Sequence, residues 1–280
     1  MSRPEPPHPG VRAISSLQNE RVKLIRSLQM RKARRDSGLF VAEGISVLLT
    51  AREAGWSPRV LLFLAGSAVQ GVARDLLVWA TGAGAECLEV TPAVLAKVAA
   101  KDNPQTMLGV FAQRWADAPP PGRAREEALW VVLEAIRDPG NLGTIIRTAD
   151  AVSANGVMLI GTSCDPYAHE AVRASMGSIF NVVLVGLSLE RFLGWAETWN
   201  GDVIGTSLSA DEDFRAVVYR PPTLLVMGSE GPGLSPALAA ACSRLVKIPM
   251  AGRLDSLNLA VAAGLMLYEI RRDRLQLSGS

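Results

Sequence analysis

The sequence predicts an α/β protein built from two domains. Short apolar segments alternate with longer amphipathic ones along most of the 280 residues, which is the pattern of strands alternating with helices. A proline-rich polar segment, ADAPPPGRAREE at 116–127, interrupts this alternation and is typical of a linker. Strands after the linker are apolar runs suited to burial on both faces, so we expect a parallel sheet covered by helices there.

These boundaries divide the chain into four parts. We assign residues 1–36 to a basic N-terminal extension, 37–114 to a small α/β domain, 115–127 to the linker and 128–280 to a larger α/β domain.

The extension concentrates positive charge. Residues 1–36 carry a net charge of +6 in a chain whose total is +2, so the rest of the chain sums to −4. The segment 15–35 has helical spacing, with Val22, Ile25 and Leu28 on one face. Its basic residues are our candidates for contact with nucleic acid: Arg21, Lys23, Arg26, Arg31, Lys32, Arg34 and Arg35. The alternative is an ordinary solvated helix face.

Apolar runs, and glycines at the ends of helices, indicate the bounds of the remaining strands and helices. In the first domain we expect strands at 39–44, 59–65, 85–90 and 106–113, with helices at 45–55, 68–84 and 91–100. In the second we expect strands at 128–136, 156–161, 179–186, 202–208, 222–228 and 244–250, with helices from 144, at 189–200 and at 256–274.

Several classes of function find no support in the sequence. The cysteines Cys87, Cys164 and Cys242 are far apart and odd in number, which argues against a disulfide framework or a zinc site. The two histidines lie in no metal-ligand pattern, so we expect no metal. No apolar run is long enough to span a bilayer, and MSRPEPPHPG lacks the core of a signal peptide. We therefore expect a cytoplasmic protein without membrane contact.

Three loops at predicted strand ends combine glycine with hydrogen-bonding residues. They are RDPGNLG at 137–143, GSEGPGLSP at 228–236 and PMAGRLDSLN at 249–258. Ligands of parallel sheets bind at the carboxyl ends of the strands, so these loops are candidate binding elements. Neither GxxxxGK[ST] nor GxGxxG occurs in them. The plainer interpretation makes each glycine a turn former and Asn141 or Ser256 a helix cap.

Together the loops resemble a known family. NLGTIIRTADA, LLVMGSEGPGLSP and IPMAGRLDSLNLAVAAGLMLYE are similar, in order and internal spacing, to the three motifs of the SpoU (TrmH-like) RNA ribose 2'-O-methyltransferases of the SPOUT superfamily. The resemblance implies a trefoil-knotted C-terminal domain, a homodimer and the cofactor S-adenosylmethionine. The first domain, which begins with FVAEG, resembles the small L30e-like RNA-binding module found in front of many such enzymes.

Matching the motifs residue by residue implies the site. Catalytic residues would be Asn141, Arg147, Glu230, Ser256 and Asn258. Cofactor contacts would fall at Gly228, Ile248 and Leu257, with Met227, Pro249 and Met250 nearby. The third motif often reads SLNVS, whereas this chain has SLNLA with Ala260, which removes a small hydroxyl group there. We further expect Ser256 to be the N-cap of the last helix.

Arg147 is a charged residue that lies among apolar residues at helical spacing. A guanidinium stays protonated in proteins, so we expect it to stabilise negative charge on the ribose 2'-oxygen or to bind a phosphate, with the general base left open. The alternative is a structural ion pair with Asp150 or Glu134.

The resulting hypothesis is an RNA ribose 2'-O-methyltransferase that acts on ribosomal RNA. Transfer RNA is the alternative substrate, and a non-catalytic RNA-binding or ribosome-assembly protein is the alternative class. A third possibility, a nucleotide enzyme of ordinary Rossmann type, would lack its phosphate motif.

Overall fold

A computed structural model describes residues 10–99, 104–120, 126–253 and 256–276 of the chain. The chain divides into two compact units. Unit 1 comprises Met1–Gln113 together with Tyr167–Phe180, and unit 2 comprises Arg114–Pro166 and Asn181–Ser280. Parts of the extension and of the linker, residues 1–9 and 121–125, lie outside the described residues.

Unit 1 is built on a five-stranded mixed sheet with the spatial order β1-β4-β3-β5-β2. The strands are β1 (Val11–Ile14), β2 (Leu39–Glu43), β3 (Val60–Leu64), β4 (Glu86–Val90) and β5 (Met107–Ala112). The strands β1, β4 and β3 pair in parallel, whereas β5 is antiparallel to both β3 and β2. The helices are α1 (Glu20–Ser27), α2 (Arg31–Ser37), α3 (Ile45–Glu53), α4 (Gly71–Gly82) and α5 (Pro92–Ala99).

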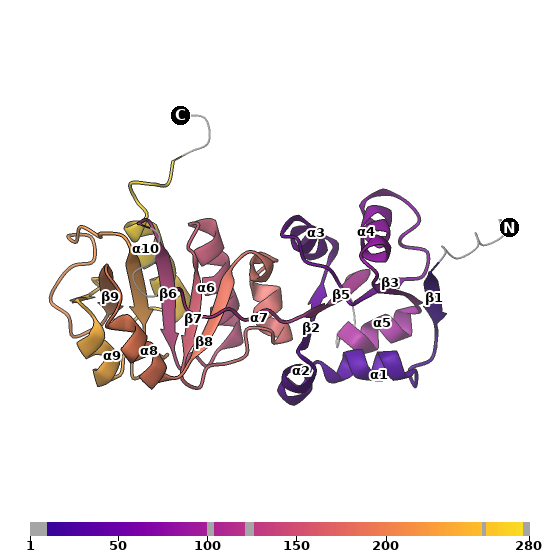
Figure 1. Cartoon of the computed structure of the whole chain (residues 1–280), viewed down its shortest axis with the longest axis horizontal. Coiled ribbons are helices and arrows are strands. Elements are labelled where there is room, and N and C mark those ends of the chain that lie inside the picture. Colours follow the sequence, from indigo (N-terminus) through magenta and orange to yellow (C-terminus); the bar gives the residue numbers. More distant parts are fainter. Residues whose placement is uncertain (1–9, 100–103, 121–125, 254–255, 277–280) are drawn as a thin grey trace. The chain divides into compact units, whose positions relative to one another are not determined.

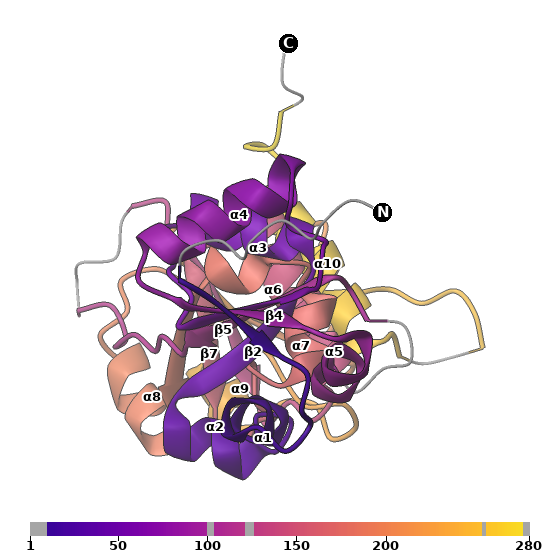
Figure 2. The ribbon, with the colours of Figure 1, turned by 90° about the vertical axis from the view of Figure 1, so that its right-hand side faces the viewer.

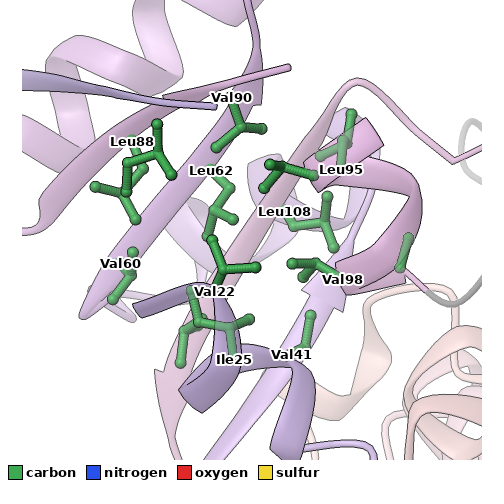
Figure 3. Packing of buried hydrophobic residues seen from close by; sticks show 14 of the residues in the cluster. Val22, Ile25, Val41, Val60, Leu62, Leu88, Val90, Leu95, Val98 and Leu108 are labelled. Carbon is green, nitrogen blue, oxygen red and sulfur yellow. The ribbon is translucent and has the colours of Figure 1, made fainter. Parts of the chain in front are cut away.

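Helices cover both faces of this sheet. The helices α3 and α4 lie on one face, and α1 and α5 lie on the other (Figures 1 and 2). The core beneath α1 and α5 is aliphatic: Val22 and Ile25 of α1 pack with Leu62, Leu88 and other strand residues (Figure 3). Burial of such side chains, at about 1.5–3 kcal/mol each, is the main force that holds these helices on the sheet.

The N-terminal basic segment is therefore part of unit 1. The strand β1 joins the sheet beside β4, and α1 buries its apolar face in the core. The single helix expected at 15–35 is wrong, because the chain breaks between α1 and α2 at Leu28–Met30. Arg34 stabilises the break: its guanidinium donates hydrogen bonds of 2.8 Å to the carbonyls of Leu28 and Gln29.

A segment from the second half of the sequence completes unit 1. It contains α7 (His169–Ala174) and the 3-10 turn η1 (Ser178–Phe180). Phe180 packs with Phe111 and Trp56 at ring-centroid distances of 4.9 and 5.0 Å, and Tyr167 lies 4.6 Å from Phe40. The Trp56 indole also donates a 2.9 Å hydrogen bond to the Phe180 carbonyl. The strand expected at 179–186 accordingly begins only at Val183.

Unit 2 contains a six-stranded sheet that is parallel, as predicted, and the structure gives its strand order as β11-β9-β10-β6-β7-β8. The strands are β6 (Leu129–Glu134), β7 (Gly156–Ile160), β8 (Val183–Leu187), β9 (Asp202–Thr206), β10 (Thr223–Met227) and β11 (Arg244–Val246). The helices are α6 (Pro139–Ala151), α8 (Leu189–Ala196), α9 (Pro236–Ala241) and α10 (Leu259–Ile270).

The helices of unit 2 pack in two pairs. The helix α6 contacts α10, and α8 contacts α9 on the other side of the sheet (Figure 1). Beneath α8 and α9 the core includes Trp130, Phe192 and Leu238. The trefoil knot implied by the family resemblance stays a prediction. Among the described residues, no helix has the length and apolar character needed to cross a membrane.

Candidate active site

The candidate site of unit 2 lies where β6, β10 and β11 end. The strands β6 and β10 are neighbours in parallel register, with Leu133 opposite Met227, so the loops that follow them emerge side by side. The first loop leads into α6, the second contains Glu230, and the third leads from β11 to α10. This arrangement brings together the three segments singled out in the sequence.

A chain of hydrogen bonds connects one residue from each segment. The side-chain amide of Asn258 donates to the Asn141 side-chain carbonyl at 2.9 Å. The Asn141 amide in turn donates to Oε1 of Glu230 at 3.3 Å. These residues are 117 and 89 positions apart in sequence, and only the fold brings them into contact.

Glu230 is held by backbone as well as by Asn141. The amides of Arg137 and Asp138, in the loop before α6, donate to its two carboxylate oxygens at 3.2 and 3.3 Å. Partial burial opposes ionisation of Glu230, but these hydrogen bonds outweigh it and lower the pKa of the carboxyl below its usual value. The group is therefore a carboxylate at neutral pH.

Arg147 lies on the solvent face of α6. The helix begins at the N-cap Asp138 with Pro139 in its first turn, and it buries Ile145, Ile146 and Ala149. Arg147 lies between these positions and is exposed. Across the described part of the chain its guanidinium has no hydrogen-bond or ion-pair partner, so the expected alternative of a structural ion pair is not observed.

Both acids considered as partners of Arg147 are engaged elsewhere. Asp150 accepts a 3.0 Å hydrogen bond from the Asn181 side chain. Glu134 accepts a 2.8 Å hydrogen bond from the backbone amide of Ser235. The charge of Arg147 thus remains available to a bound anion.

The cap of the last helix differs from the expectation. Asn258, not Ser256, is the N-cap of α10, and its side-chain oxygen accepts from the amides of Ala260 and Val261 at 2.9 and 3.3 Å. Ser256 lies two residues earlier and is exposed. The side-chain oxygen of Asn258 can cap the helix while its side-chain nitrogen donates to Asn141. A serine has one hydroxyl group and no separate amide nitrogen for the second contact.

The loop after β10 needs glycine. A Cβ atom on Gly228 would lie 2.0 Å from the carbonyl carbon of Gly233, a distance that no side chain tolerates. Reciprocal hydrogen bonds of 3.1 and 3.2 Å between Ser229 and Gly233 close this turn. Met227, just before it, is fully buried at the end of β10. The turn thereby holds Glu230 beside the first loop.

The third loop has features suited to S-adenosylmethionine. Ile248 and Met250 are half-buried, while Pro249 and Leu257 are exposed. Within the described residues, the backbone groups of 248–253 and 256–257 make no hydrogen bonds with the rest of the protein. Free amides and carbonyls beside apolar side chains can bind both the polar edge and the faces of an adenine ring. The donors present therefore fit the cofactor.

The sequence patterns did not reveal every group in this region. The amides of Arg137 and Asp138 were missed, although an aspartate followed by proline is a usual helix start. Cys164 lies near this site and is partly buried. Burial and the nearby carboxylates Glu230, Asp138 and Asp165 raise the pKa of its thiol to about 12. A neutral thiol is a poor nucleophile, so the raised pKa gives no support to a nucleophilic role for Cys164.

The basic residues of unit 1 fall into different groups. Arg34 must be removed from the RNA-binding candidates, because it is only 4% exposed and is bound to backbone carbonyls. Ion pairs occupy three more: Arg21 with Glu86, Lys23 with Glu20, and Arg35 with Asp36. Of the other candidates, Arg26, Arg31 and Lys32 are exposed, and Arg31 also has an interaction of its own.

No group of three or more His, Cys, Asp and Glu side chains suited to a metal ion occurs among the residues that the structure describes. The acids of the candidate site instead accept hydrogen bonds from amides.

Comparison with known proteins agrees with this geometry. The SpoU rRNA Methylase family model matches residues 128–268, and the MRM3-like substrate binding domain model matches residues 19–109. The chain is 33% identical over 274 residues to the 23S rRNA (uridine(2479)-2'-O)-methyltransferase of Streptomyces viridochromogenes, covering 95% of this chain and 94% of the relative. It is 26% identical over 261 residues to the 23S rRNA (guanosine(2553)-2'-O)-methyltransferase RlmP of Bacillus subtilis, covering 93% and 100%.

Among solved structures, the chain is similar to the AdoMet-bound rRNA methyltransferase from Sinorhizobium meliloti. The TM-score is 0.86 with 38% sequence identity, over 95% of this chain and 100% of that one. The match extends over both units, and the family model covers the three loops that form the candidate site. The chain therefore belongs to the SpoU rRNA methylase family, with a substrate-binding domain in front of the methylase domain.

Proposed function

We propose that this protein transfers the methyl group of S-adenosylmethionine to a ribose 2'-hydroxyl of ribosomal RNA. The observation that carries the proposal is the Asn258–Asn141–Glu230 hydrogen-bond chain, which joins all three loops, with the free Arg147 on the helix that one of them begins. Relatives that cover nearly the whole chain are named for 2'-O-methylation of 23S rRNA, which favours ribosomal RNA over transfer RNA.

Arg147 is assigned the electrostatic part of the reaction. A ribose 2'-hydroxyl must lose its proton before or during transfer, and the oxygen then carries negative charge. A guanidinium cannot accept that proton, because it already holds one. Its planar set of donors suits an anionic oxygen or an adjacent phosphate. The general base stays unassigned.

The polar chain is assigned a positioning role. Glu230 orients Asn141 at the first turn of α6, and Asn258 holds the same side chain from the start of α10. Both contacts fix the entry of the helix that carries Arg147. The exposed hydroxyl of Ser256 is available to the ribose. Bound S-adenosylmethionine supplies a sulfonium-activated methyl group beside these residues, and Gly228, Ile248 and Leu257 would line its site together with Met227, Pro249 and Met250.

Unit 1 is assigned RNA binding through Arg26, Arg31 and Lys32. These exposed cations would neutralise phosphates, so affinity for RNA is expected to fall as salt rises, and each lost phosphate contact should reduce the slope of log affinity against log salt by about 0.7–1. Arg34→Lys is not a suitable control variant for this salt-dependence measurement, because it would disturb the hydrogen bond from Arg34 to the Leu28 carbonyl at the α1–α2 break. A salt-independent affinity would remove this assignment.

A second copy of the chain is the partner proposed for α10. Val261, Leu265 and Tyr268 of this helix are 52%, 42% and 53% exposed, and they line an apolar groove with Phe214. We expect the wild type to be a dimer by light scattering and Leu265→Glu to shift it to the monomer mass. The control, Val78→Glu, changes a residue that is 63% exposed on α4 and should leave the dimer intact. A monomeric wild type would refute this interface.

The reaction is tested with labelled S-adenosylmethionine and unmodified ribosomal or transfer RNA, followed by digestion and mass analysis of the nucleosides. We expect a 2'-O-methylated nucleoside from ribosomal RNA. Arg147→Ala should lower kcat by about a hundredfold or more, as removal of a transition-state donor does, while binding of cofactor and RNA is retained. Arg191→Ala, which changes another exposed arginine, is the matched control.

The other outcomes of this assay have distinct meanings. Base methylation would contradict the ribose assignment. Methylation of transfer RNA alone would change the substrate class. An inactive wild type that binds cofactor and ribosomal RNA would favour a non-catalytic RNA-binding protein.

A further inference from the structure

The segment Tyr167–Phe180 presents three exposed side chains, Glu170, Arg173 and Met176, from a tightly held backbone. Ala171, Val172, Ser175 and Ile179 are buried, which fixes the segment in unit 1. Arg173 and Met176 point the other way, and Met176 is 55% exposed.

The backbone at Met176 is strained. Its φ is +52°, in the left-handed region, which is unfavourable for a residue that bears a side chain. The turn is nevertheless well fastened: the Ser175 hydroxyl donates to the Val172 carbonyl at 2.7 Å, and the Ser178 amide donates to the Ser175 carbonyl at 3.0 Å. Glycine would occupy this position without strain. A methionine held here and exposed to solvent points to a use for its side chain.

Arg173 lies directly beside it. The Met176 amide donates to the Arg173 carbonyl at 3.1 Å, so the two residues share one turn of chain. Within the described ranges the Arg173 guanidinium has no hydrogen-bond or ion-pair partner. A flexible apolar thioether beside an unpaired guanidinium matches a nucleotide, because the base presents an apolar face and the phosphate a negative charge.

The covalent chain keeps this pair near the candidate site. Asn181, five residues after Met176, donates a 3.0 Å hydrogen bond to Asp150, which follows Arg147 by three residues on α6. Five residues span at most about 18 Å even when fully extended. Met176 is therefore no more than about 18 Å of chain from a residue that is bonded to the helix that carries Arg147.

We propose that Arg173 and Met176 bind the RNA substrate, Arg173 through a phosphate and Met176 through the face of a base. The inference rests on the proposed function for the identity of the ligand. The proposed RNA contact is contributed by the second half of the sequence, and it is additional to the one assigned to the basic residues of α1 and α2.

The test uses full-length protein with Met176→Gly, Met176→Leu and Arg173→Ala. Met176→Gly removes the side chain and relieves the strain, so loss of folding cannot explain its effect. We expect Met176→Gly to raise both the Kd and the KM for unmodified large-subunit rRNA about fivefold to tenfold, Met176→Leu to restore most of the affinity, and kcat at saturating RNA to stay within about twofold. Binding of S-adenosylmethionine should not change.

Arg173→Ala should weaken RNA binding and reduce the slope of log affinity against log salt by about 0.7–1, whereas Met176→Gly should leave the slope unchanged. Arg191→Ala is again the matched control. Unchanged RNA affinity in both variants, or an equal loss of cofactor binding, would overturn the inference.

The RNA-binding measurement separates this inference from the proposed function. If the wild type transfers no methyl group, the proposed function fails, yet a loss of RNA affinity in these variants still supports the contact. If the wild type methylates ribose and the variants bind RNA normally, the inference alone fails.

Discussion

We expect a change at Glu230 to affect stability little and activity strongly. Its carboxylate accepts hydrogen bonds from two backbone amides and from Asn141, yet the side chain is exposed. We expect Glu230→Gln to change the free energy of unfolding by less than about 0.5 kcal/mol, as exposed substitutions usually do. Methyl transfer should fall about 10- to 100-fold, because the first turn of α6 loses its anchor.

The lowered pKa of Glu230 predicts the sign of the pH dependence. A carboxyl whose pKa is lower in the folded state contributes stability above its ordinary pKa of 4.5, and loses it as the pH falls through the folded-state value. The difference in melting temperature between wild type and Glu230→Gln should therefore be constant near neutrality and disappear below about pH 4.5. A difference that grows in acid would contradict the assigned charge state.

At the scale of elements, α10 depends on Asn258 for both its start and its link to α6. Asn258→Ala should reduce the free energy of unfolding by about 1 kcal/mol, the usual cost of a lost N-cap. Asn258→Ser keeps an oxygen for the amides of Ala260 and Val261 but loses the donor to Asn141. We expect Ser to restore stability in chemical denaturation but not methyl transfer. Recovery of both would show that Asn258 acts only as a cap.

For the molecule as a whole, the segment 167–180 makes the N-terminal unit depend on the C-terminal half of the sequence. Phe180 is 5% exposed among the rings of unit 1, so Phe180→Ala should destabilise that unit by about 3–5 kcal/mol. Amide hydrogen exchange should accelerate in β2 and β5. Phe192→Ala, in the core of unit 2, is the control and should accelerate exchange in unit 2 instead. Exchange changes confined to residues after 113 in the Phe180 variant would contradict this assignment.

The sequence by itself determined the alternation of strands and helices, the parallel sheet of unit 2 and the three loops of the site. These features depend on periodicity, turn residues and short spacings, which are local properties of the chain. It also indicated Asn141, Arg147, Glu230 and Asn258 as residues of one site through the family motifs.

Only the tertiary structure decided which contacts those residues make. The burial of Arg34 depends on a break between helices, and the choice of Asn258 over Ser256 as cap depends on Asn141 at a distance of 117 residues. The position of Phe180 in unit 1 depends on Trp56 and Phe111, which precede the linker. For Asn258 and Phe180 the free energy comes from partners far away in sequence, and no local pattern records which partner the fold will supply. The carbonyls that bind Arg34 are only six and five residues away, but they become available at a helix break that the helical spacing did not indicate.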